Sequence, residues 1–550
     1  MSADDGSERT LGSMDSHQPV PSNQSKLAEA EKTLQENQRS LGPEHVSTLD
    51  AAHNLGRLYA EQGKLNEAEK MYQYALKGYE KTLGLEHLST LTTVNSLGVV
   101  CMNQDKLSEA EKLYQRALQG KEKTLGKNHV ETLDTVHNLG NLYVKLGNLA
   151  KAGGTYLRAL QGYEKALGPE HQSTLDTVNC LGIVYMDMKK FEMAEKMYQR
   201  ALQGKERTLG PEHMSTLDIV GNLGILYMAQ DRLVEAEDMC KRGLQGKEKA
   251  FGPEHKSTLS TVHHLANVYN DQGKLDEAEE LYLRALHGQE KTLGLEHTST
   301  LKTAQSLCGL YLAKRRLADA EQMCQRVLRG YEKVLGPTHT LTLSTVNNLA
   351  LIFVEQDKLE EAEEMYLRAL KEKERTLGEQ NMSTLSTVNN LSGLYHKQSR
   401  LAEAEVMCRR AVEGYKRLLG PNHSSTLGAV NNLGILYFDQ NKLEEAEEMY
   451  QYALQGFENT LGVEQAATYR PALNTLQNLG ELYKRQGKLD QAEQAFSRAL
   501  DGFQALFGPD HETSNRITWR LLLLRSDESC NGPSIEGLST GGNVNSTMTD

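Results

Sequence analysis

Histidine recurs in this 550-residue chain at a spacing that could suggest a metal site. At nine positions in register with a 42-residue interval, a histidine stands three residues after the glycine of a Leu-Gly or Phe-Gly pair. These are His45, His87, His129, His171, His213, His255, His297, His339 and His423. A zinc ion needs ligands at about 2 Å, whereas copies of one position in packed helical repeats lie roughly 10 Å or more apart. We therefore expect the histidines to stabilise turns and not to share a metal ion.

Paired carboxylates recur as Glu-Ala-Glu, at Glu67/Glu69, Glu109/Glu111 and Glu445/Glu447. Two neighbouring carboxylates can serve as general acid and base, but these pairs fall at predicted helix starts, where negative charge is favoured. The sequence has no phosphate loop of the GxxxxGK[ST] type, no HExxH and no GxSxG. We expect solvated structural acids, with no catalytic residue, no cofactor and no enzyme activity.

The histidines and the paired glutamates all belong to a sequence repeat of 42 residues. Its clearest marker is a Leu-Gly pair, in one case Phe-Gly, that recurs at eleven positions spaced 42 residues apart. The pairs begin at Leu41, Leu83, Leu125, Leu167, Leu209, Phe251, Leu293, Leu335, Leu377, Leu419 and Leu461. A fixed period of 20 to 50 residues is typical of a stacked repeat array. Such an array presents an extended surface and each unit contacts only its neighbours.

Each unit predicts two antiparallel helices. In the second unit, Leu91, Val94 and Leu97 form an apolar stripe at helical spacing. Serine at the start of this first helix, followed three residues later by a carboxylate in several copies, predicts an N-terminal cap. Ser108 and Glu111 predict a capping box for the second helix. Glycine after the second helix, and in some copies after the first, as at Gly63 and Gly273, supplies the left-handed residue that ends a helix.

This unit resembles the tetratricopeptide repeat, because Leu97-Gly98, Ala110, Tyr114 and Ala117 stand at that family's signature spacings. The 42-residue length is similar to the repeats of kinesin light chains and nephrocystin-like proteins. The resemblance implies an all-α, right-handed superhelical solenoid of tandem helix pairs over residues 26–525. It has about eleven full repeats and a partial unit at each end. A kinesin light chain also has a coiled coil before its repeats, for which residues 1–25 are too short and too polar.

Composition indicates where the array ends, and also which kinds of partner and compartment suit the protein. Residues 1–25 and 526–550 are polar, and we expect both tails to be disordered. Four extra residues near 462–468 predict a bulged loop. The net charge of −13 is interspersed with basic residues, without the basic stripe that nucleic acid requires. No apolar run reaches the ~18 residues of a membrane helix, and no signal segment precedes the array. We expect a cytoplasmic protein that does not insert into membranes.

Cysteine and tyrosine share one position of the repeat. Cys240, Cys324 and Cys408 stand where other copies have tyrosine. The seven cysteines show no CxxC and no regular pairing. We expect small core residues in a reducing compartment.

Polar residues precede the central leucine of each first helix, and the resemblance implies that such asparagines line a concave peptide groove. We name the residue two before this leucine the outer position and the residue one before it the inner position. Amides both donate and accept hydrogen bonds, which suits binding a peptide backbone. The candidates are Asn95, Asn138, Asn179, Asn222, Asn347, Asn348, Asn389, Asn390, Asn431, Asn432 and Asn478. An inner asparagine could instead bond between adjacent helices, so the outer ones are the better groove candidates.

Apolar residues occupy variable positions two and five residues after the same leucine. Ile183, Met186, Ile225 and Met228 could form pockets for a partner's apolar side chains. They could equally pack against the neighbouring helix. Basic residues are few at these places, so we expect no dedicated clamp for an acidic peptide or a chain end.

These features predict a non-enzymatic scaffold or adaptor for protein–protein interaction, which binds peptide segments of protein partners along the groove. The alternative is the ligand-sensing repeat part of a nucleotide-binding signalling ATPase system whose NTPase domain lies outside this sequence.

Overall fold

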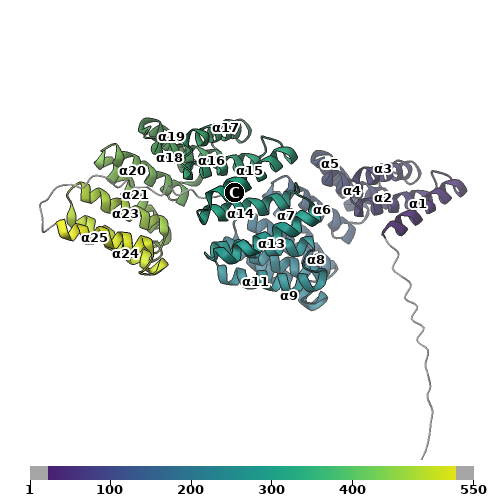
Figure 1. Ribbon diagram of the computed structural model, residues 1–550. Coiled ribbons are helices and arrows are strands. Elements are labelled where there is room, and N and C mark those ends of the chain that lie inside the picture. The colour runs from purple at the N-terminus through teal and green to yellow at the C-terminus, as the bar shows by residue number, and fades with distance from the viewer. Residues whose placement is uncertain (1–22, 528–550) are drawn as a thin grey trace, which may run out of the picture. The chain divides into compact units, whose positions relative to one another are not determined.

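The computed structural model describes residues 23–527, and every regular element within that range is a helix (Figure 1). The all-α prediction of tandem paired helices is confirmed. Most of the two predicted tails, residues 1–22 and 528–550, lies outside the described residues. Residues 23–25 and 526–527, which the sequence assigned to the tails, belong to helices.

Eleven helix pairs follow one another along the chain, each made of a first and a second helix. The first helices are α2 (Val46–Glu61), α4 (Leu88–Asn103), α6 (Val130–Lys145), α8 (Gln172–Asp187), α10 (Met214–Ala229), α12 (Lys256–Asp271), α14 (Thr298–Ala313), α16 (Thr340–Glu355), α18 (Met382–Lys397), α20 (Ser424–Asp439) and α23 (Arg470–Arg485). The second helices are α3 (Leu65–Thr82), α5 (Leu107–Thr124), α7 (Leu149–Ala166), α9 (Phe191–Leu209), α11 (Leu233–Phe251), α13 (Leu275–Leu293), α15 (Leu317–Val334), α17 (Leu359–Leu377), α19 (Leu401–Leu419), α21 (Leu443–Leu461) and α24 (Leu489–Phe507).

Unpaired helices complete the set. A lone second-type helix, α1 (Asn23–Ser40), precedes the pairs, and a lone first-type helix, α25 (Glu512–Asp527), follows them. Both match the predicted partial units. The four extra residues near 462–468 form a one-turn helix, α22 (Val463–Ala466), where the sequence predicted a bulged loop.

Glycines determine how closely the two helices of a pair approach. A Cβ atom added at Gly162 of α7 would lie 2.4 Å from Cδ2 of Leu133 in α6. Across the same pair, a Cβ atom at Gly140 would lie 2.5 Å from the Tyr156 ring. Contacts this short leave no room for a methyl group unless the facing side chain shifts, so a larger residue, such as Glu372 at the first of these positions in repeat eight, requires local repacking.

The residues at the glycine–tyrosine contact differ between repeats, and their summed volume is not constant, since Gly224 faces Cys240 whereas Ala266 is matched with Tyr282. Where the first helix has a larger residue, Ser392 or Cys308, the second helix has cysteine, Cys408 or Cys324, in place of tyrosine. All four side chains are buried. The predicted role of these cysteines as small core residues is confirmed.

The turn histidines cap the first helices. His213 has an extended backbone, and its Nδ1 accepts a hydrogen bond from the Ser215 N–H at 3.2 Å. In the ninth repeat Asn381 does the same through Oδ1, at 2.9 Å from the Ser383 N–H. The turn-stabilising role predicted for histidine is confirmed, and it has a definite mechanism.

The predicted serine caps are wrong, because the helices begin before the serines. Ser215 lies inside α10, and Ser108 lies inside α5, which begins at Leu107. Lys106 occupies the cap position of α5 and makes no side-chain capping bond. In α7 the same position is Asn148, whose Oδ1 accepts from the Lys151 N–H at 3.1 Å, whereas in α5 Lys106 contacts the preceding repeat instead.

Those contacts show that the second glutamate of each Glu-Ala-Glu is not simply a solvated acid. Glu69 accepts hydrogen bonds from Gln104 and from Lys106 of the next repeat, at 2.9 Å each, and its side chain is 17% exposed. The pair Glu447 and Lys488 repeats this at 2.9 Å. The interpretation as solvated acids is therefore wrong for Glu69 and Glu447, whereas the first glutamate of each pair is exposed, as expected.

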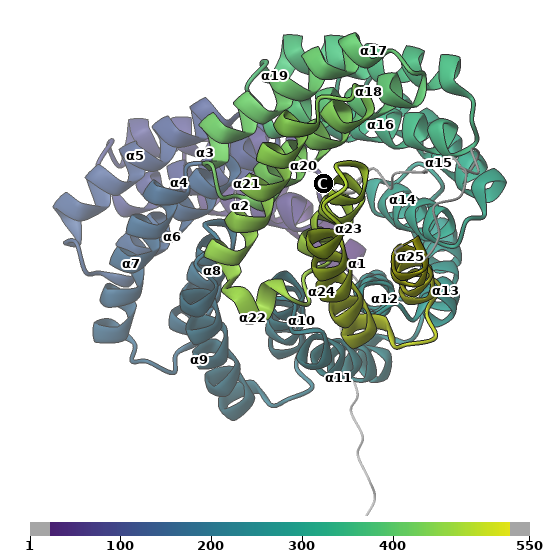
Figure 2. The same ribbon diagram turned by 90° about the vertical axis from the view of Figure 1, so that its left-hand side faces the viewer.

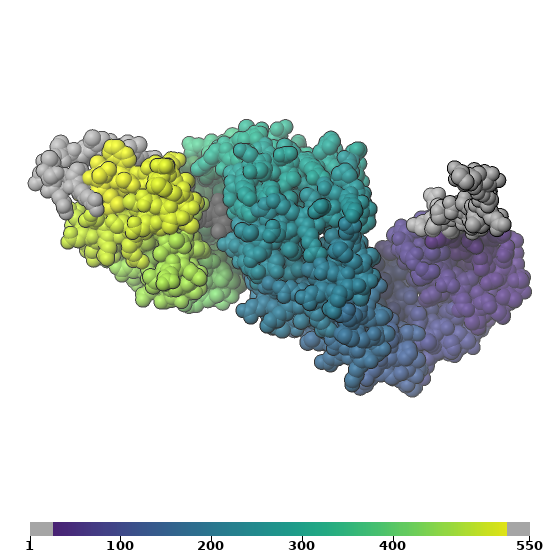
Figure 3. Space-filling view, turned by 90° about the horizontal axis from the view of Figure 1, so that it is seen from below, coloured from purple at the N-terminus to yellow at the C-terminus, as the bar shows by residue number. Residues whose placement is uncertain are grey.

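The chain divides into two structural units, residues 1–250 and 251–550. Within each unit a second helix packs against the first helix of its own repeat and against that of the next. In the space-filling view, side chains of consecutive helices are in contact on the face that is drawn (Figure 3). Each unit therefore has a continuous core that passes from repeat to repeat.

Two glycines of one helix should respond in opposite ways to alanine. Gly162→Ala should destabilise the chain by about 1–3 kcal/mol, because its methyl group would overlap Leu133. Gly154→Ala, in the same helix with nothing within 4 Å, should stabilise it by up to about 1 kcal/mol. Thermal unfolding followed by circular dichroism measures both. Equal shifts would contradict the packing account.

The histidine cap should be replaceable by asparagine but not by alanine. We expect His213→Ala to lose about 1 kcal/mol, the usual value of an N-cap bond. His213→Asn should retain it, because Asn381 already fills the same position in repeat nine. Urea unfolding of the two variants measures the difference, and equal losses would show that the side-chain bond contributes nothing.

Candidate functional site

The first helices of consecutive repeats lie side by side within each unit, and we call the surface they form the first-helix face. In the second unit α16 and α18 lie inside, while α17 and α19 lie outside them (Figure 2). All the predicted site residues are on first helices. The structure therefore brings them to this face.

The candidate asparagines are linked across repeats by side-chain hydrogen bonds. In each case an inner asparagine donates from Nδ2 to Oδ1 of the outer asparagine in the preceding repeat. The pairs are Asn138 to Asn95 at 3.3 Å, Asn222 to Asn179 at 3.1 Å, Asn432 to Asn389 at 3.4 Å and Asn478 to Asn431 at 3.1 Å. We call this series the amide row. Each bond uses one of the two N–H groups of the inner amide, and these side chains, Asn431 excepted, are partly exposed.

The row is interrupted in the eighth repeat. Asn347 is buried, and its Oδ1 has no hydrogen-bond partner. Asn348 and Asn390 are partly exposed. The sequence favoured outer positions for peptide binding, yet the outer residues Asn347 and Asn431 are the two buried members of the candidate set.

Histidine replaces the outer asparagine in repeats one, three and six. His53, His137 and His263 contact the hydroxyl of the threonine 40 residues further on, at 2.9, 3.1 and 3.2 Å. Burial lowers the pKa of all three. For His263 the pKa falls from 6.5 to about 3, with smaller contributions from His264 and Lys302. These imidazoles are neutral at physiological pH and act as hydrogen-bonding groups of the row.

Apolar side chains accompany the row. Ile183, Met186, Ile225 and Met228 are all half-buried. Their counterparts in repeat two, Val99 and Met102, are partly buried and pack against the core. The same positions therefore contact the core and still leave part of each side chain at the surface.

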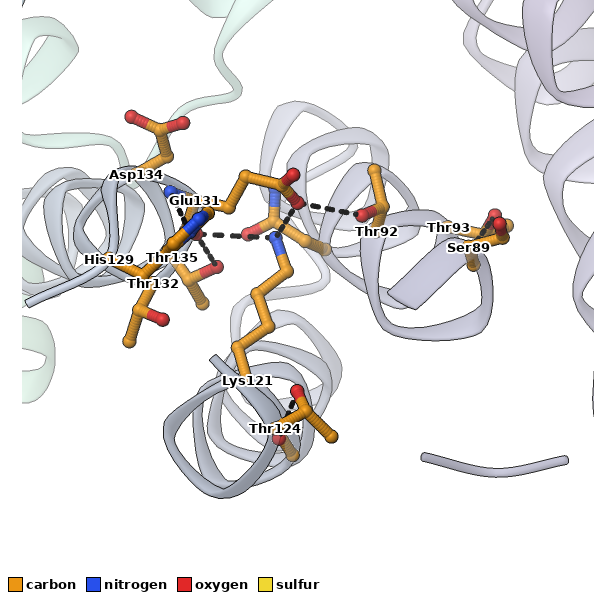
Figure 4. Close-up of polar contacts among 12 residues, drawn as sticks. Ser89, Thr92, Thr93, Lys121, Thr124, His129, Glu131, Thr132, Asp134 and Thr135 are labelled. Atoms are coloured by element: carbon orange, nitrogen blue, oxygen red, sulfur yellow. Dashed lines mark hydrogen bonds and ion pairs between the residues drawn. The ribbon is translucent and has the colours of Figure 1, made fainter. Parts of the chain in front are cut away.

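A second set of polar groups lies beneath the face and comes from the second helices. Lys121, only 2% exposed, donates to the Glu131 backbone oxygen at 3.2 Å and lies 3.6 Å from its carboxylate (Figure 4). Thr92 donates to the same carboxylate at 3.3 Å. Desolvation lowers the pKa of Lys121, opposed by Glu131. The sequence-based prediction missed this set because it placed candidate binding residues only on the first helices. The sequence does contain a signal for it: a lysine at a repeat position that is otherwise mostly aromatic, with an acidic residue in the adjoining first helix.

Metal binding and membrane insertion each require a particular arrangement of residues. Within residues 23–527 no group of three or more histidine, cysteine, aspartate or glutamate side chains is placed to hold a metal ion. In the same range no helix is both long enough and apolar enough to cross a membrane.

The neutral form of His263 should make the second unit sensitive to acid. Below pH 6.5 the unfolded chain takes up a proton that folded His263 does not, so stability falls as the pH drops towards 3. We expect a loss of about 2 kcal/mol between pH 7 and pH 5. His263→Asn should remove this loss. Hydrogen exchange of α12 at the two pH values, corrected for intrinsic rates, measures it, and the same pH dependence in both proteins would contradict the assignment.

Comparison with known proteins identifies the repeat. The family models described as tetratricopeptide repeat match residues 48–89, 89–165, 173–249, 216–291, 298–371, 383–459 and 471–517. These ranges cover more than half of the chain, and the matches are to repeats throughout. No curated protein matches the chain.

Solved structures similar to the chain include other repeat proteins. BtubC (BKLC) from P. vanneervenii is 20% identical over 50% of this chain and 93% of its own, with a TM-score of 0.35. A putative kinesin light chain from Podosopora anserina with nearly identical TPR-like repeats is 27% identical over 37% of this chain and 97% of its own, with a TM-score of 0.33. The apo form of RapI is 15% identical over 52% and 97%, with a TM-score of 0.42.

Proposed function

The chain belongs to the tetratricopeptide repeat family, and we propose that it is a non-enzymatic scaffold or adaptor that binds extended peptide segments of partner proteins on its first-helix faces. The family fold is generally one of protein interaction. The amide row is the observation that carries the proposal. It places polar side chains with spare donors and acceptors at the same height in successive repeats.

The spacing of the row suits an extended backbone. Consecutive helices of one type lie roughly 10 Å apart, and an extended chain rises about 3.3 Å per residue. One repeat therefore spans about three peptide residues. An amide that presents both a donor and an acceptor can bond to backbone N–H and C=O groups whatever the peptide sequence.

The apolar residues beside the row supply selectivity. Ile183, Met186, Ile225 and Met228 leave part of their surface uncovered, and methionine adapts its shape to different apolar side chains. Main-chain bonding combined with side-chain pockets is the usual division of labour in peptide recognition. This arrangement gives affinity through the row and preference through the variable positions.

A charge placed on the first-helix face should abolish binding. The probe is a displayed library of peptides tiled across a proteome and selected on the full chain. Ile183→Glu combined with Ile225→Glu should reduce retention of the selected peptides at least tenfold, because the carboxylates would be desolvated beneath a bound segment. The fold should tolerate the change, since Glu481 stands at the same position in repeat eleven.

The matched control lies on a second helix. Leu157→Glu in α7, where the leucine is 41% exposed, should leave retention unchanged. Failure of the library to yield any retained peptide would contradict the proposed function. So would retention that Leu157→Glu abolishes and the isoleucine variants leave intact.

A further inference from the structure

Each second helix sends one long polar or aromatic side chain towards the first helix of its own repeat, at the position after the close-contact glycine. In four repeats of the first unit this side chain meets the carboxylate 29 residues earlier. The pairs are Tyr79 with Asp50, Tyr163 with Asp134, Lys205 with Asp176 and Lys247 with Asp218. Each lysine of this set is therefore neutralised by an aspartate of the chain, and Lys121 by Glu131.

Lys373 of the eighth repeat breaks this rule. Its side chain is as buried as the others, with 2% exposed, but the residue 29 positions earlier is Ser344. Its Nζ donates to the Ser383 backbone oxygen at 3.2 Å and to the Thr387 hydroxyl at 2.9 Å. No carboxylate of the described chain is paired with it. Desolvation lowers its pKa to about 8.

The nearby acid does not compensate this charge. Glu372, which replaces the close-contact glycine in this repeat alone, is paired with Arg375 at 2.9 Å. A buried ammonium without a counter-charge is costly. Lys373 therefore occupies the same repeat position as Lys205 and Lys247 but has no carboxylate beside its ammonium group.

The repeat register shows what surrounds Lys373. In the first unit a cavity of about 270 Å³ opens beside the amide row, lined by Asp134, His137, Asn138, Tyr163, Ser173 and Asp176. Five repeats later the same positions hold Ser344, Asn347, Asn348, Lys373, Ser383 and Ser386. Two acids have become hydroxyls, and the tyrosine has become a lysine. The charge of this set of positions therefore changes from negative in the first unit to positive around Lys373.

Asn347 occupies the first-helix position next to Lys373 by the repeat register. It is buried, and its Oδ1 is unbonded, at the place where the amide row is interrupted. Its counterparts His53, His137 and His263 contact the threonine that corresponds to Thr387. By register, Asn347 and the Lys373 ammonium thus adjoin the same threonine hydroxyl, but the free Oδ1 needs a donor, so only the ammonium requires an anion.

We propose that Lys373, with the surrounding serine hydroxyls, forms a subsite that binds a carboxylate side chain of the partner peptide. A carboxylate matches the space, since Asp176 fills the corresponding place beside Lys205 and serine is two heavy atoms shorter than aspartate. The ammonium supplies the counter-charge and the hydroxyls supply donors. This inference rests on the proposed function and adds an acidic residue to the partner, where the sequence predicted no clamp for one.

The test uses peptides that differ at one central position. A library of random 12-residue peptides carries aspartate, glutamate, asparagine, glutamine, serine or phosphoserine at that position and is selected on the full chain. Wild-type protein should enrich aspartate or glutamate at least tenfold over the matching amide. Ser344→Asp should abolish this preference, because it restores the internal carboxylate found beside Lys205.

Two further variants make the result specific. Ser260→Asp places the same charge at the corresponding position of repeat six, beside Gln289 and not a lysine, and should leave the preference intact. Lys373→Met removes the ammonium and should abolish the preference without lowering the melting temperature, since an apolar residue replaces an unpaired buried charge.

The outcomes separate this inference from the proposed function. Retained peptides without carboxylate preference, or a preference that survives Ser344→Asp, would overturn the subsite and leave the scaffold standing. Enrichment of phosphoserine alone would overturn the carboxylate assignment. Retention of no peptide by any protein would overturn both.

Discussion

The distance between the two helices of a repeat is set by a glycine of the second helix that is pressed against a leucine of the first. The contact occurs in ten of the eleven repeats, and a Cβ atom at the glycine would lie 2.3 to 2.6 Å from the leucine. Because the helices are this close, a tyrosine or cysteine can fill the space above a small first-helix residue. The side chain after the glycine can likewise reach the first-helix residue 29 positions earlier. The core, the buried polar pairs and the position of the first-helix face all depend on this one approach.

Constant spacing allows repeats to be compared as natural variants of one another. Some positions that contact the neighbouring helix change in compensating pairs, as with Gly140 and Tyr156 against Ser392 and Cys408. Positions on the first-helix face vary more widely in polarity, and Ile183 corresponds to Glu481, which pairs with Arg520 at 3.0 Å. Lys373 is informative because it belongs to the first class by burial, yet has lost its compensating partner.

The sequence predicted most of the fold, since period, helix pairing, glycine stops and core cysteines all follow from local patterns repeated many times. It failed where two residue types could serve one role. Serine is the commoner cap, but the extended backbone at His213 brings Nδ1 to the N–H of Ser215, so the helix begins before that serine. Glu69 was taken for a solvated acid because its partner Lys106 lies in the next repeat. The asparagines were placed on the correct helices, but the bonds between them depend on the stagger of adjacent repeats, which one sequence does not give.

The central claim is that peptides bind on the first-helix face, and methionine oxidation tests it directly. Met186 and Met228 lie on that face, whereas Met193, 43% exposed, lies on the second helix α9. Mild peroxide treatment of the full chain, with and without a selected peptide, followed by mass spectrometry, gives the oxidation rate of each. The account predicts that the peptide slows oxidation of Met186 or Met228 and leaves Met193 unchanged. Protection of Met193 alone would contradict it.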